Sequence, residues 1–70
     1  MADDPVRVNA RGMKCPWPAL RAARAMRAAD AILITADDPI APRELEALAR
    51  QQGWDFTPID TDLFSLRKAG

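Results

Sequence analysis

The chain has 70 residues, of which 49% are hydrophobic and 29% charged, and its formal net charge is zero. These values predict one globular domain over residues 1–70 with a small core and no enclosed cofactor cavity, and they exclude a disordered chain. No apolar run approaches the roughly 18 residues of a membrane span, and the acidic opening Met1–Asp4 lacks the features of a signal peptide. We therefore expect a cytoplasmic protein without membrane contact.

Charge is unevenly distributed along the chain. From Arg7 to Arg27 six residues are basic and none is acidic, whereas from Asp30 to Asp62 eight are acidic and two are basic. Such polarity can steer an acidic partner or an anionic substrate, although helix arginines are about as often only a solvated face. A nucleic-acid binder is usually basic overall, so we expect no direct contact with nucleic acid.

The first half of the chain predicts a strand, a turn and a helix. Residues 6–10 alternate in the way typical of a short strand, and Gly12 supplies a turn. Residues 19–29 are strong helix formers. The positions that share one face at helical spacing are Ala19, Leu20, Ala23 and Met26. We expect that face to pack on the sheet, with Arg21 and Arg24 pointing away from it.

Two prolines set the start of this helix. Proline fixes its own φ and biases the preceding residue away from helical angles, so Cys-Pro-Trp-Pro at 15–18 indicates a helix start. Either Cys15 is the N-cap, or the regular helix begins later with Trp17 as its cap. In both cases Cys15 lies at the positive end of the helix. That location, with Lys14 and Arg11 nearby, predicts a modestly lowered thiol pKa.

The second half predicts a strand, a helix and a hairpin. Residues 31–36 form a nearly continuous apolar run, typical of a buried central strand. The following helix is capped either by Asp38 before a proline or by Ala41 before a proline, and Gly53 ends it. Its expected apolar positions are Leu45, Leu48 and Ala49.

The last two strands are expected over residues 54–59 and 63–67, joined as a hairpin by a turn at 60–62. Pro58 places the former strand near a sheet edge or near its own end. The element order is then β-α-β-α-β-β. Since each helix has one apolar stripe to bury, we predict an α/β two-layer sandwich with two helices on one face of a four-stranded mixed sheet.

The side chains that are missing exclude several kinds of site. The chain has no histidine and one cysteine, which excludes a Cys-His nucleophile pair, a closed zinc site and a two-cysteine oxidoreductase within the chain. No glycine-rich phosphate loop is present. The remaining reactive group is Cys15, a candidate for reversible sulfur exchange, with a buried structural cysteine as the alternative.

Residues 9–18, Asn-Ala-Arg-Gly-Met-Lys-Cys-Pro-Trp-Pro, resemble the signature of the TusA/SirA family of small sulfur carriers, whose hallmark is Cys-Pro-x-Pro at the start of the first helix. The similarity continues along the chain. The position of Arg24 is similar to that of a basic helix residue in the family. The approach to the family's second helix resembles Asp37-Asp38-Pro39, and its terminal strand resembles Leu66-Arg67-Lys68.

The resemblance implies a sulfurtransferase that works by persulfide relay. Cys15 would accept sulfur from a cysteine desulfurase or a rhodanese-like protein and pass it to an acceptor protein, with no metal or organic cofactor. Relatives serve tRNA thiolation, cofactor sulfuration and sulfur oxidation, and some handle selenium. Two other functions stay open: a non-catalytic interaction module with a structural Cys15, and a redox sensor with one cysteine.

The resemblance also assigns supporting roles to neighbouring residues. Pro16 and Pro18 would fix the exposed sulfur, and Gly12 would shape the approach to it. Asn9 stands where the family often has Asp, so a negative charge is absent there and the thiolate is slightly favoured. An exposed Trp17 could anchor a partner, or it could pack against the helix.

Overall fold

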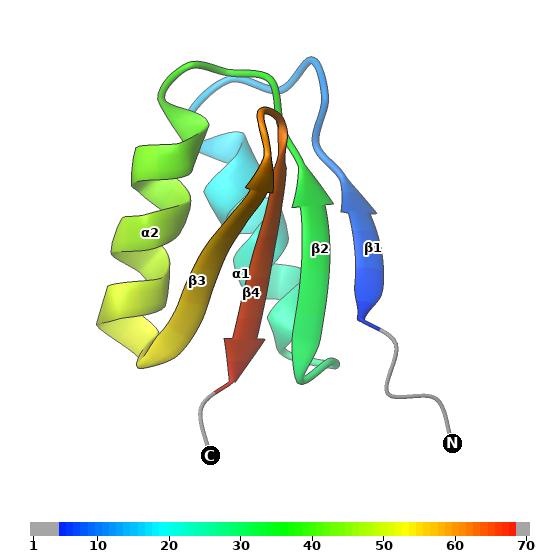
Figure 1. The fold of residues 1–70 in the computed structure, drawn as a ribbon, viewed down its shortest axis with the longest axis vertical. Helices are drawn as coiled ribbons and strands as arrows, with labels where there is room; N and C mark the ends of the chain where they lie inside the picture. The colour runs from blue at the N-terminus through cyan, green and yellow to red at the C-terminus, as the bar shows by residue number, and fades with distance from the viewer. Residues whose placement is uncertain (1–4, 69–70) are drawn as a thin grey trace.

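The fold is taken from a computed structural model, which describes residues 5–68. The acidic opening at residues 1–4 lies outside this range. The elements in chain order are β1 (Val6–Asn9), α1 (Trp17–Met26), β2 (Ala31–Thr35), α2 (Ala41–Gln52), β3 (Trp54–Asp60) and β4 (Leu63–Lys68). Both helices lie behind one face of the sheet (Figure 1), which confirms the predicted α/β sandwich.

The sheet has the strand order β1-β2-β4-β3. β1 pairs with β2 in parallel, while β4 pairs antiparallel with both β2 and β3. The predicted central place of residues 31–36 and the predicted hairpin are confirmed. Pro58 lies on β3, an edge strand, where its missing N–H costs no hydrogen bond to a further strand.

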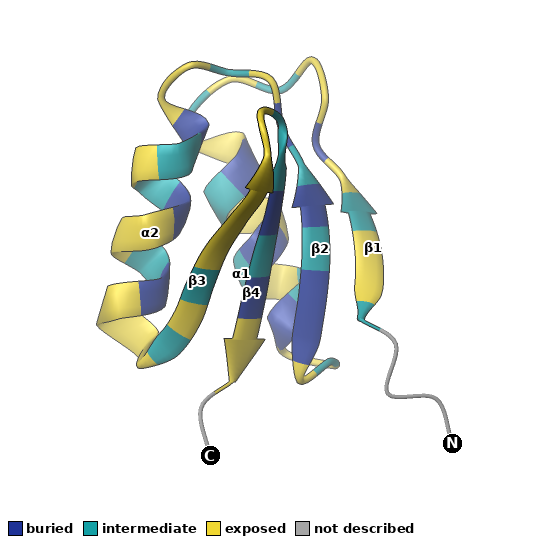
Figure 2. Ribbon diagram, viewed as in Figure 1, coloured by how far each residue is buried: buried dark blue, intermediate teal, exposed yellow. Residues whose placement is uncertain are grey.

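The core lies between the helices and the helix-facing side of the two central strands (Figure 2). Ile32 and Ile34 of β2 and Leu66 of β4 are completely buried there. From α2, Leu45 is also completely buried. Since β1 and β2 end at the same edge of the sheet, the loops that follow them meet there, beyond the core.

The predicted inner face of α1 is wrong by about one residue. The buried positions are Pro18, Ala22 and Met26, which share one face at a spacing of four residues. Leu20, which we expected in the core, is 52% exposed. Met26, which we also expected in the core, is buried there. Alanines surround this helix on most sides, so they define its inner face weakly, and Pro18 lies in the core in place of Leu20.

Neither helix has an N-cap residue that the sequence indicated. The N-cap of α1 is Pro16 rather than Cys15 or Trp17, and that of α2 is Ile40 rather than Asp38 or Ala41. Asp38 forms a turn before α2, because its carbonyl oxygen accepts the Ala41 N–H at 2.9 Å. The end of α2 at Gly53, which has a φ of 78°, is confirmed.

Candidate functional site

The only cysteine lies in the loop between β1 and α1. Ala10, completely buried, anchors the start of this loop, and Gly12 turns it with a φ of 79°, a conformation that favours glycine. Near its end, the Trp17 N–H donates to the Lys14 carbonyl oxygen at 2.9 Å. The Cys15–Pro16 peptide bond is cis. The loop thus delivers Cys15, half-buried, to the residue before the N-cap of α1.

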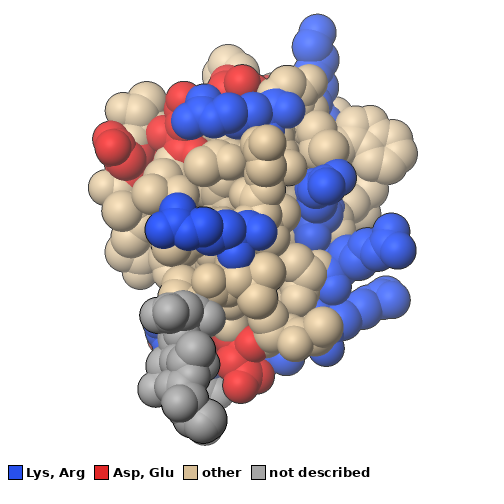
Figure 3. Space-filling model, turned by 90° about the vertical axis from the view of Figure 1, so that its right-hand side faces the viewer, with Lys and Arg blue, Asp and Glu red and all other residues tan. Residues whose placement is uncertain are grey.

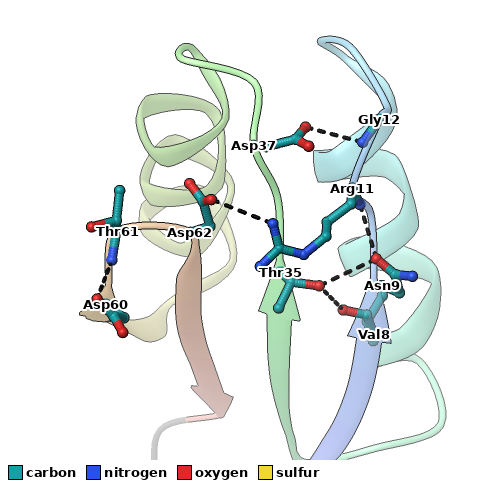
Figure 4. A network of polar contacts seen from close by, with 9 residues as sticks. All are labelled: Val8, Asn9, Arg11, Gly12, Thr35, Asp37, Asp60, Thr61 and Asp62. Atoms are coloured by element: carbon teal, nitrogen blue, oxygen red, sulfur yellow. Dashed lines mark hydrogen bonds and ion pairs between the residues drawn. The ribbon is translucent and has the colours of Figure 1, made fainter.

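Two carboxylates from the loop after β2 hold the cysteine loop in place. The Gly12 N–H donates to Asp37 Oδ1 at 3.0 Å (Figure 4), and the Cys15 N–H donates to Asp38 Oδ2 at 2.7 Å. The other oxygen of Asp38, Oδ1, accepts the Ile40 N–H at 2.9 Å. Asp38 therefore joins the backbone of Cys15 directly to the start of α2.

The surroundings of Asp38 explain its own acidity. Hydrogen bonds from the backbone N–H groups of Ile40 and Cys15 lower the pKa of this carboxyl, and the positive charge of Lys14 adds to the effect. Asp38 is therefore ionised whenever the pH is near neutral. Its negative charge lies beside the cysteine under all such conditions.

The pKa of the Cys15 thiol is raised rather than lowered. Partial burial is the largest cause, followed by the negative charge of Glu44, a hydrogen bond with Glu44 and the charge of Asp38. The expected lowering by the helix and by Lys14 and Arg11 is therefore wrong. The reason is that the fold partly buries the thiol, and that α2 and the loop before it also place carboxylates next to it.

The Arg11 side chain forms an ion pair with a residue of the β3–β4 turn. Its Nη1 lies 3.4 Å from Asp62 Oδ2, across the end of the sheet in the β3–β4 turn (Figure 4). Both side chains are exposed, so this ion pair is a weak surface contact.

Asn9 has a structural role at the end of β1. Its Oδ1 accepts the Arg11 N–H at 3.0 Å and the Thr35 hydroxyl at 3.3 Å (Figure 4). Asn9 thus shapes the turn into the cysteine loop and ties it to β2.

Comparison with known proteins shows the family and the fold of the chain. Residues 6–67 match the family described as sulfurtransferase TusA. The chain belongs to the TusA family. Its fold is also that of a SirA-like protein from Desulfitobacterium hafniense, with a TM-score of 0.72 and 19% identity over 93% of this chain and 99% of that one. No curated protein matches the sequence.

Membership of the TusA family supports a sulfur-carrier type of function, which involves contact with other proteins. The matched residues 6–67 include Cys15 and the loops that hold it. Over residues 5–68 no helix has the length and apolarity that crossing a membrane requires.

The predicted site residues of this TusA-family protein lie in three places. Gly12, Lys14, Cys15 and Pro16 lie together in the cysteine loop, whereas Pro18 is buried in the core. The predicted site residues on α1, Trp17, Arg21 and Arg24, are exposed and line a groove on the side toward β1.

Sequence reasoning missed the three carboxylates of the site, Asp37, Asp38 and Glu44. It assigned Asp38 to helix capping alone. One signal was present: Asp-Asp-Pro follows the central strand, and loops that follow parallel strands meet at the same edge of a sheet.

In this TusA-family protein, Glu44→Gln is expected to lower the pKa of the Cys15 thiol toward its ordinary value, because a nearby negative charge is removed. At neutral pH more of the thiol is then ionised. The rate of alkylation by iodoacetamide should rise at neutral pH, and its pH profile should shift to lower pH. Glu46→Gln is the matched control, since Glu46 is exposed and its Oε2 lies 3.5 Å from Arg50 Nη2 rather than beside the thiol. Identical profiles for wild type and Glu44→Gln would refute this role of Glu44.

Proposed function

We propose that this TusA-family protein carries sulfur as a persulfide on Cys15 and relays it from a donor protein to an acceptor protein. The observation that carries the proposal is the position of the only thiol. Cys15 is half-buried, next to the start of α1, on a loop that Asp37 and Asp38 fix by hydrogen bonds. The family match supplies the sulfur chemistry.

In the proposed reaction, the Cys15 thiolate attacks the terminal sulfur of a persulfide on the donor. A new S–S bond forms at Cys15 Sγ, the donor's S–S bond breaks, and the donor leaves as a thiolate that takes up a proton. Transfer to the acceptor repeats the exchange with Cys15 as the leaving group. In each step one S–S bond forms and one breaks, so the exchange consumes no oxidant or reductant. The proposed relay therefore needs no metal or organic cofactor.

The donor in this proposal is a cysteine desulfurase or a rhodanese-like protein, and the relay operates in the cytoplasm, where a single thiol stays reduced. Trp17 is 61% exposed and follows Cys15 by two residues, which suits an aromatic anchor for a partner. Arg21 and Arg24, one and two turns further along the helix, add positive charge for an acidic partner.

The proposal is tested by incubating the protein with a cysteine desulfurase and free cysteine and then measuring its intact mass. We expect a gain of one sulfur atom that disappears after reduction. Protein alkylated beforehand at Cys15 is the control and should gain nothing. If neither a desulfurase nor a rhodanese-like donor adds sulfur, the relay is wrong, and retained binding of the donor would then support a non-catalytic interaction module.

A further inference from the structure

A groove of about 590 Å³ lies between α1 and β1 on the side of the molecule away from α2. Apolar side chains from both elements line it, among them Val8, Leu20 and Ala25. Leu20 and Trp17 are 52% and 61% exposed, although both are large and apolar. Exposed apolar surface of this kind, with polar groups around it, is typical of an interaction site.

The same groove is basic. Arg7 of β1 and Arg21 and Arg24 of α1 also line it, and among residues 5–68 no acidic residue does. Figure 3 shows this side of the molecule, where lysine and arginine side chains extend over a tan surface. The groove is therefore complementary to a ligand that has both apolar and negatively charged groups.

The backbone of β1 adds a third feature, a free hydrogen-bonding edge. β1 pairs with β2 on one side, and no strand within residues 5–68 pairs with its other side. The Ala10 N–H donates to the Thr35 carbonyl oxygen of β2 at 2.8 Å. The backbone N–H and C=O groups of successive residues in a strand point alternately to its two sides. The N–H and C=O of Val8 therefore also point to β2, whereas those of Arg7 and Asn9 point outward.

We propose that the groove binds an extended segment of a partner protein, with aliphatic and acidic side chains in alternation, which adds to the free edge of β1 as a fifth strand. The outward backbone groups of Arg7 and Asn9 pair with the segment. Its aliphatic side chains cover Val8 and Leu20 on the side of the helix. Its carboxylates alternate with them and lie on the other face of the strand, near Arg7.

This inference rests on the proposed function only for the identity of the partner, a donor or an acceptor of sulfur. Cys15 does not line the groove. Binding of the segment is therefore independent of the thiol, and it can be measured without any sulfur transfer.

The first test uses a short fluorescent peptide of alternating valine and glutamate. It should bind saturably, more weakly at high salt, and should shift the amide NMR signals of Arg7 and Asn9. Arg21→Glu/Arg24→Glu should weaken binding roughly tenfold, because the groove loses two positive charges and gains two negative ones that repel the acidic peptide. The control Arg27→Glu/Arg43→Glu changes the net charge equally at exposed residues outside the groove and should have a smaller effect.

A second test distinguishes strand addition from simple charge attraction. Two versions of the peptide carry N-methyl groups on alternate amides, one on the odd and one on the even positions. Strand addition needs the N–H groups of one set only, so one version should lose binding and the other keep it. Equal binding of both versions would overturn the proposal, as would failure of the unmethylated peptide to bind or equal binding of a valine-lysine peptide.

The two proposals can fail separately. Cys15→Ser should bind the peptide as the wild type does. If peptide binding is retained while no donor loads Cys15, the carrier role fails and the groove stands. If loading proceeds while the peptide does not bind, the groove proposal fails alone.

Discussion

Cys15→Ser is expected to gain no sulfur from any donor while remaining folded. The change replaces one atom, so the half-buried side chain keeps its shape, and the backbone N–H of residue 15 still donates to Asp38. Oxygen at this position cannot replace a thiolate as nucleophile for sulfur. Intact mass after incubation with donor reports loading, and the circular dichroism melting curve reports the fold.

Loss of loading in this variant should therefore be complete rather than partial, since the chain has no second cysteine. A reducible sulfur atom on Cys15→Ser would contradict the proposed site. Peroxide distinguishes the remaining alternative. If the wild type gains oxygen under peroxide but never sulfur from a donor, Cys15 is a redox sensor and not a carrier.

Leu45→Ala is expected to cost about 2–5 kcal/mol of unfolding free energy, because it removes a buried side chain and leaves a cavity. Leu45 has no exposed surface and packs α2 on the sheet. A domain of this size has a total stability of only about 5 kcal/mol, so the variant should keep about 0–3 kcal/mol of it at 25 °C. Urea denaturation followed by circular dichroism measures the loss.

Leu20→Ala is the matched control, since it makes the same chemical change at a side chain that is 52% exposed. We expect it to cost less than about 1 kcal/mol. It should, however, weaken the binding of the valine-glutamate peptide, because Leu20 lines the groove. Equal destabilisation by the two variants would mean that Leu20 belongs to the core and that the groove is occupied in solution.

Much of the fold could be predicted because several residues or runs are compatible with only one position in the secondary structure. The apolar run at 31–36 fits a central strand, Gly53 fits a left-handed helix end, and Pro58 fits an edge strand. The face of α1 could not be predicted in the same way. Alanine fits both a core and a surface, so the position of Leu20 gave a misleading inner face.

The candidate site was predictable in part for a different reason. The position of Cys15 follows from prolines next to it in the sequence, which act locally. Asp38 and Glu44 reach the thiol through the fold, from residues 23 and 29 positions further along the chain. Their effect on the thiol pKa has the opposite sign to that of Lys14, the charged residue next to Cys15 in the sequence. Partial burial of the thiol, the largest cause of the raised pKa, also arises from the fold, so the charges next to Cys15 in the sequence predicted the wrong direction of the shift.

The hydrogen bonds of Asp38 have a consequence for how the protein responds to acid. The pKa of this carboxyl is lowered in the fold, so its stabilising contribution is complete above the ordinary aspartate pKa and is lost only as the pH falls through the lower, folded value. Within the range of pH found in cells, the hydrogen bond from the Cys15 N–H to Asp38 is therefore retained. Because the pKa of the Cys15 thiol is raised, the sulfur also stays mostly protonated across that range, on a backbone that acid does not displace.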